Sequence, residues 1–153
     1  MHVRKLGSLF QIRRAFAAHG RSRVLSAQHF GRMHDLSTTA LAGTPVEIHC
    51  ITWGFEFTSA DLNAQVAIFT SNSTTPDDAS MVFMGSTTIT IAGDANNSSA
   101  TAVFSPPIYV DANALVFVEL AMPAASGAPA YAIGANNDPQ TSASWINTDG
   151  DCG

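Results

Sequence analysis

Residues 45–57 read PVEIHCITWGFEF, and this stretch decides the fold class. Large apolar side chains occupy every second position from 51 to 57, whereas small or polar ones occupy the positions between them. The first set is Ile51, Trp53, Phe55 and Phe57, and the second set is Cys50, Thr52, Gly54 and Glu56. Successive side chains of a β-strand point to opposite faces, so the pattern predicts a strand with one face in a core.

Six further segments rich in Val, Ile, Phe and Thr predict strands, at 64–71, 81–91, 99–105, 114–121, 129–134 and 142–147. Turn-forming Ser, Asn, Asp, Gly and Pro separate them. We therefore predict an all-β fold, an antiparallel β-sandwich of the jelly-roll or immunoglobulin-like kind with about seven to eight strands. Segment 114–121 is apolar on both faces except at Glu119, which predicts a central strand. Pro106 and Pro107 predict a sheet edge or a crossing between sheets.

Charge divides the chain into two parts. It has 7 Lys and Arg residues and 12 Asp and Glu residues, and its formal net charge is −5. All the acids lie from Asp35 onward, and all the basic residues precede position 33, namely Arg4, Lys5, Arg13, Arg14, Arg21, Arg23 and Arg32. We therefore assign a basic N-terminal arm or leader to residues 1–36 and an acidic β-sandwich domain to residues 37–153.

The basic arm admits several interpretations. Apolar residues between positions 3 and 18 recur at helical spacing, so we expect a partly helical or disordered arm. Arginines interrupt every apolar core that a secretory signal would need, whereas an organellar transit peptide, an arm for acidic partners and a simple leader stay open. No cluster of Lys and Arg exceeds two residues, which disfavours nucleic acid as a partner. No apolar run is long enough to predict a membrane span.

Cys50 and Cys152 are the two cysteines of the chain. A disulfide between them would tie the last segment to the first strand of the domain and stabilise the fold by up to about 4–5 kcal/mol in the chain-entropy model. The alternative is two free thiols, with Cys50 acting as a small buried apolar side chain. We predict the disulfide, because an exposed thiol is rarely retained in an oxidising compartment.

Glu56 and Glu119 lie on predicted strands in a domain that has no Lys or Arg. If they are buried, each must be protonated, hydrogen-bonded, coordinated to a cation or paired with an arginine of the arm. Two carboxylates that flank a cleft could also hydrolyse glycosidic bonds. His49 offers the domain a single base and no motif of a nucleophilic serine accompanies it, so we expect it at a strand edge or in a hydrogen-bonded core position.

Asn147, Asp149 and Asp151 place oxygen atoms at alternate positions, as the opening of a calcium loop does. Solvated turns that use Asn, Asp and Gly for backbone reasons are the alternative. We predict no other cofactor. Trp53 and Trp145 are candidates for a sugar-binding surface, but Trp53 alternates with Phe55 and Phe57, which favours a core position for it.

Five blocks of the domain resemble a β-sandwich module of secreted and surface-anchored bacterial proteins. They are WGFE at 53–56, AIFTSN at 67–72, ALVFVEL at 114–120, AIGANNDPQTSASWI at 132–146 and DCG at 151–153. The corresponding blocks of that module read approximately FGIE, V-x-L-Y, LVVEV, IGSN…QT-x-x-SY and CG, in the same order. The resemblance implies a β-sandwich fold, an extracellular or cell-surface location and no assigned activity.

We therefore expect a non-catalytic structural, adhesive or accessory module of an exported protein. The first alternative is a self-assembling shell or filament subunit whose basic arm docks on the acidic domain of a neighbouring copy or on nucleic acid. The second is a small protein that binds or acts on glycans through Glu56 and Glu119. Protein or glycan surfaces are the expected partners, and targeting to an organelle through the arm is the alternative location.

Overall fold

The structure is a computed structural model that describes residues 7–8, 24–25, 28–77, 79–94, 96–123, 125–126, 131–133 and 144–148. The fold is all-β, as predicted, and its one helical segment in these residues is the 3₁₀ turn η1 (Leu36–Thr38). No helix in this part of the chain has the length and apolar character needed to cross a bilayer.

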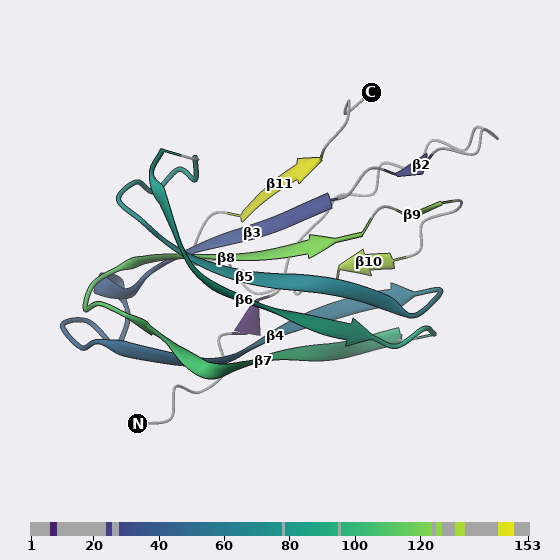
Figure 1. Ribbon diagram of the computed structural model, residues 1–153, viewed down its shortest axis with the longest axis horizontal. Helices are drawn as coiled ribbons and strands as arrows, with labels where there is room; N and C mark the ends of the chain where they lie inside the picture. The colour runs from purple at the N-terminus through teal and green to yellow at the C-terminus, as the bar shows by residue number, and fades with distance from the viewer. Residues whose placement is uncertain are drawn as a thin grey trace.

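Seven strands carry most of the fold (Figure 1): β3 (Gln28–Asp35), β4 (Val46–Thr58), β5 (Leu62–Ser71), β6 (Met81–Ile91), β7 (Asn96–Val110), β8 (Leu115–Met122) and β11 (Ser144–Thr148). Four short strands complete it, namely β1 (Gly7–Ser8), β2 (Val24–Leu25), β9 (Ala125–Ser126) and β10 (Tyr131–Ile133). The predicted strands at 45–57, 64–71, 81–91 and 114–121 agree with β4, β5, β6 and β8 to within two residues at each end.

The strands form two main sheets. An antiparallel five-stranded sheet has the order β11-β3-β8-β5-β6, with β8 at its centre between β3 and β5. In the four-stranded sheet, β4 pairs with β7 and β10 in antiparallel fashion and with β1 in parallel. A small third sheet joins β2 to β9. The central position of β8 confirms the prediction made from its two apolar faces.

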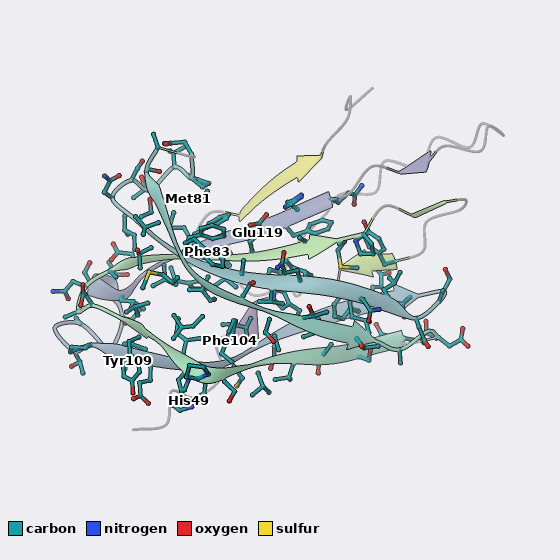
Figure 2. The ribbon with its side chains drawn as sticks, in the orientation of Figure 1. His49, Met81, Phe83, Phe104, Tyr109 and Glu119 are labelled. Carbon is teal, nitrogen blue, oxygen red and sulfur yellow. The ribbon has the colours of Figure 1, made fainter. Side chains whose placement is uncertain are left out.

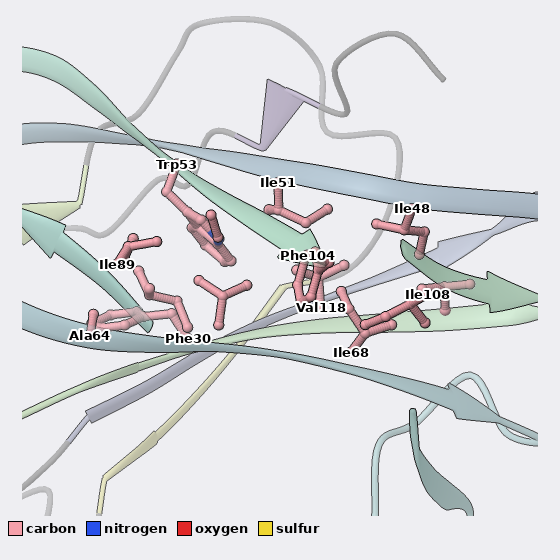
Figure 3. Close-up of a cluster of buried hydrophobic side chains, with 14 of the residues drawn as sticks. Phe30, Ile48, Ile51, Trp53, Ala64, Ile68, Ile89, Phe104, Ile108 and Val118 are labelled. Carbon is pink, nitrogen blue, oxygen red and sulfur yellow. The ribbon is translucent and has the colours of Figure 1, made fainter. Parts of the chain in front are cut away.

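The core lies between the two main sheets and takes side chains from both (Figure 3). Ile51, Trp53 and Phe55 of β4 contribute from one sheet, and Val66 and Ile68 of β5 contribute from the other. All five are at most 2% exposed. The predicted alternation of β4 is confirmed for these residues, because the intervening Thr52, Gly54 and Glu56 are partly or fully exposed.

The loops use the turn chemistry that the sequence predicted. Asp94 lies in the turn between β6 and β7 with φ of 62°, and Asn113 lies in the turn between β7 and β8 with φ of 63°. Asp and Asn tolerate this left-handed conformation better than most residues do. The Asn113 side chain also accepts a hydrogen bond from the Gly43 backbone nitrogen at 2.7 Å, which joins two loops that are distant in sequence.

The predicted boundary between the arm and the domain, at residue 36, does not coincide with the start of the sheet. β3 lies inside the segment assigned to the arm, yet it pairs with β8 at eight consecutive positions from Gln28 to Asp35. Its sequence, QHFGRMHD, mixes polar and apolar residues without a clean alternation, so the pattern gave no strand signal. Gly7 and Ser8 form β1, so these two positions of the arm are neither helical nor disordered. The rest of 1–23 lies outside the described residues.

Pro106 and Pro107 lie within β7 and do not end it. The peptide bond between Ser105 and Pro106 is cis, and β7 pairs with β4 on both sides of the two prolines. A bulge between Ile48 and Cys50 of β4 interrupts the register opposite this part of β7. Among the described strands β7 hydrogen-bonds only to β4, so the predicted sheet edge is confirmed.

Candidate functional site

The two candidate carboxylates lie on opposite outer faces of the fold. Glu56 follows the inward-facing Phe55 of β4 and is exposed on the four-stranded sheet. Glu119 lies between the core residues Val118 and Leu120 of β8, so it points outward from the five-stranded sheet (Figure 2). The core separates the two groups, and they do not flank a common cleft. Burial, which the sequence left open for both groups, does not apply to Glu56, and it applies in part to Glu119, whose side chain is 19% exposed.

Glu119 has a histidine as its partner. The Nδ1 atom of His29 on β3 contacts the Oε1 atom of Glu119 across the pair of strands. Gly31 lies directly opposite Glu119, and the ring of Phe117 occupies the space that a side chain at position 31 would need. Of the predicted solutions for this carboxylate, the structure shows a hydrogen-bonding partner, and that partner is a histidine of β3 and not an arginine of the arm.

Arg32 is part of the five-stranded sheet rather than of a solvated arm. It is 6% exposed, and burial lowers the pKa of its guanidinium group. The other predicted arm cations, Arg4, Lys5, Arg13, Arg14, Arg21 and Arg23, lie outside the described residues.

His34 lies two residues beyond Arg32, at the end of β3 and opposite Val116 of the core. Burial, followed by the charge of Arg32, lowers the pKa of His34 to about 4. The folded state therefore holds a neutral imidazole at pH values at which an unfolded histidine is protonated.

We expect acid to destabilise the fold through His34. Because its folded pKa lies below the value of about 6.5 for an unfolded histidine, stability is constant above that pH and falls as the pH drops towards 4. The loss from this group is at most about 3 kcal/mol. Urea unfolding of the wild type and of His34→Leu at several pH values measures it. The variant should lose less stability between pH 6.5 and 4, and an identical decline in both proteins would contradict the assignment.

A polar cluster that the sequence did not predict lies on the outer face of the four-stranded sheet, formed by Glu47, His49 and Tyr109 (Figure 2). The His49 Nε2 and Glu47 Oε2 atoms are 2.9 Å apart. Hydrogen bonds from Tyr109 and His49 lower the pKa of Glu47, and Glu47 raises the pKa of Tyr109. Because this cluster is open to solvent, water competes for its contacts. His49 is thus exposed on β4 and is not the core histidine that was one of our expectations.

The cluster forms because β4 and β7 pair Glu47 with Tyr109, which lie 62 positions apart. The β4 bulge then places His49 and Cys50 both in exposed positions. No periodicity within a single segment predicts such a cross-strand contact. The sequence feature nearest to this cluster was the Pro106–Pro107 pair, which we interpreted as a sheet edge or a crossing between sheets.

The predicted disulfide is not supported. Cys50 is exposed on β4 and its thiol is free, so it is not the buried small side chain of the alternative either. Cys152, Asp149 and Asp151 lie outside the described residues. Asn147 lies in β11 opposite His29 rather than in a loop. In the part of the chain that the structure describes, no three His, Cys, Asp or Glu residues are grouped as metal ligands, so calcium stays an untested prediction.

Three of the five large hydrophobic side chains that are exposed in the described part of the chain are consecutive on β6, and the other two, Val103 and Tyr109, lie on β7. Val82 is 62% exposed, Phe83 is 59% exposed and Met84 is 38% exposed. Beside them, an open groove of about 310 Å³ separates β6 from β7 and is lined by residues 84–87 and 104–109. An exposed apolar cluster on one strand is a typical feature of an interaction surface.

No family model matches the sequence, and neither a curated protein nor a solved structure matches it.

Proposed function

We propose that the chain is a non-catalytic β-sandwich module of an exported protein, which acts by structure and by contact with another surface. The observation that carries the proposal is the cluster Val82, Phe83 and Met84, three consecutive exposed hydrophobic residues on one strand. Exposure of these hydrophobic side chains to water is unfavourable in free energy, and a partner that covers them removes this penalty.

The arrangement of the two main sheets supports the sandwich. Seven strands supply most of the backbone pairing, and one continuous core joins residues of both sheets. This layering is the typical way in which antiparallel sheets bury their apolar faces. The resemblance to a module of secreted and surface-anchored bacterial proteins supports export and a structural, adhesive or accessory role.

The placement of the carboxylates disfavours the glycan-active alternative. Glycosidases hold their acid and their base or nucleophile on either side of one bond, less than about 10 Å apart. Glu56 and Glu119 instead occupy outer faces on either side of the core. Glu119 is also engaged by His29.

Replacement of either carboxylate tests the absence of catalysis. We expect Glu56→Gln to change the free energy of unfolding by less than about 0.5 kcal/mol, because Glu56 is exposed. We expect Glu119→Gln to cost about 1 kcal/mol through its altered contact with His29. Neither variant should change the release of reducing ends from α- or β-linked oligosaccharides. Hydrolysis by the wild type that disappears in a folded variant would overturn the proposal.

A further inference from the structure

The five-stranded sheet ends at β6, which has few of the features that usually protect a sheet edge. Among the described strands β6 hydrogen-bonds only to β5, so its other side presents unpaired backbone donors and acceptors. Its sequence, MVFMGSTTITI, contains no charged residue and no proline. Natural edge strands are commonly blocked by Lys, Pro or a bulge, and β6 has only a bulge, between Phe83 and Gly85.

The edge of the other sheet provides a contrast within the same molecule. β7 carries Pro106 and Pro107, which lack backbone N–H groups. A strand that approached β7 at this point would find fewer hydrogen-bond donors. Of these two neighbouring edges, β6 is therefore the one that can accept a further strand.

A row of apolar side chains leads across the outer face of the sheet to this edge. Met33, Phe117, Phe69 and Phe83 are cross-strand partners in register on β3, β8, β5 and β6. The ring centroid of Phe69 lies 6.3 Å from that of Phe117 and 5.6 Å from that of Phe83. Met33 is 4% exposed and Phe117 is 6% exposed, whereas Phe83 is 59% exposed. The side chains of the row are therefore buried on β3 and β8, and the last one is exposed on β6. A further strand would lie beside that exposed side chain.

The self-complementary edge favours a second copy of this chain as the source of that strand, and charge determines where two copies can meet. Every charged residue after Arg32 is acidic, so two copies repel one another over most of the domain surface. β6 is neutral along its whole length, so two copies that meet there bring no charged side chains of the strand together. A two-fold axis near Phe83 would also pair Val82 of each copy with Met84 of the other, so the exposed cluster is self-complementary.

We propose that two copies associate through antiparallel pairing of their β6 strands, around Phe83, to form one continuous ten-stranded sheet. The backbone groups of both edges become hydrogen-bonded, and the two aromatic rows join at the Phe83 rings. This inference rests on the proposed contact function and names its partner and its geometry. It does not use the basic arm, which distinguishes it from assembly by docking of that arm on the acidic domain.

Sedimentation velocity of the full chain, from low micromolar to millimolar concentration, tests the proposal. The wild type should shift from monomer to dimer, and Val82→Lys and Phe83→Lys should raise the dissociation constant at least about 30-fold. Val103→Lys is the matched control, because Val103 on β7 is 63% exposed and Val82 is 62% exposed. Val103→Lys should dimerise like the wild type, and circular dichroism should show that each variant is folded.

Cross-linking tests the geometry separately. In a chain that carries Cys50→Ser and Cys152→Ser, Phe83→Cys should form a disulfide-linked dimer with oxidised glutathione, because directly opposed residues of antiparallel strands lie within disulfide reach. Val103→Cys in the same chain should not. A monomeric wild type, or a dimer that survives both lysine substitutions on β6, would overturn the proposal. A dimer that persists in both lysine variants and dissociates as the salt concentration is raised would assign assembly to the basic arm instead. Neither result bears on the test of catalysis at Glu56 and Glu119.

Discussion

Replacement of Trp53 by Ala should reduce the free energy of unfolding by about 3–5 kcal/mol. Trp53 is 0% exposed and projects from β4 into the space between the two main sheets (Figure 3). Truncation removes the largest fully buried side chain in the described part of the chain and leaves a cavity that neighbouring residues fill only in part. Since domains of this size are stable by about 5–15 kcal/mol, the loss is a large share of the total.

Urea unfolding followed by far-ultraviolet circular dichroism measures this loss without depending on tryptophan fluorescence. Trp53→Phe retains an aromatic ring and should cost clearly less than Trp53→Ala. Val103→Ala provides a surface control that should change stability by less than about 0.5 kcal/mol. If Trp53→Ala lost less than about 1 kcal/mol, Trp53 would not be a core residue, and its role as a sugar-binding surface would have to be reconsidered.

The role of Trp53 could be predicted because the information is local. Residues 51–57 alternate strictly between apolar and other side chains, and a half-buried strand is the only regular structure with that period. The same reasoning identified β5, β6 and β8, and the two apolar faces of β8 identified its central position. Where a single segment has both a high β-strand propensity and a clear hydrophobic pattern, the position of its strand in the fold can be predicted from the sequence.

β3 was missed for a physical reason. Its polar residues obtain partners only in the folded sheet, because His29 contacts Glu119 and because Arg32 is enclosed beside β8. When the sequence is read one segment at a time, such polar residues are interpreted as belonging to a solvated arm. The charge boundary near position 33 is real, yet it runs through the sheet and does not separate it from a leader.

The candidate sites were less predictable than the strands because they depend on pairing between strands. Glu56 and Glu119 occupy similar positions in their strand patterns, yet they belong to different sheets and point away from one another. Conversely, Glu47 and Tyr109 are distant in sequence and become neighbours through the register of β4 with β7. The apolar row from Met33 to Phe83 likewise exists only once four strands are aligned.

The role of Gly31 also depends on a neighbouring strand. Its replacement by Ala should reduce the free energy of unfolding by about 3 kcal/mol. A Cβ atom placed on Gly31 would lie 1.9 Å from Cζ of Phe117, and 2.5 Å and 2.8 Å from Cε2 and Cε1 of the same ring. The tip of the ring occupies the space that a side chain would need. Because Phe117 is itself 6% exposed and lies beside Phe69, it cannot move away without disturbing the apolar row.

A double-mutant cycle separates this steric cause from a general intolerance of β3 to substitution. Leu lacks the three ring atoms that would clash, so Phe117→Leu should recover about 2 kcal/mol of the cost of Gly31→Ala in the double variant. Gly85→Ala is the matched control, because its new Cβ would meet only the flexible end of Ile108, at 2.9 Å, and should cost less than about 1 kcal/mol. Additive losses in the double variant would show that Gly31 is required by the backbone of β3 and not by the ring of Phe117. A recovery would show that the ring of Phe117 is the reason why position 31 cannot carry a side chain.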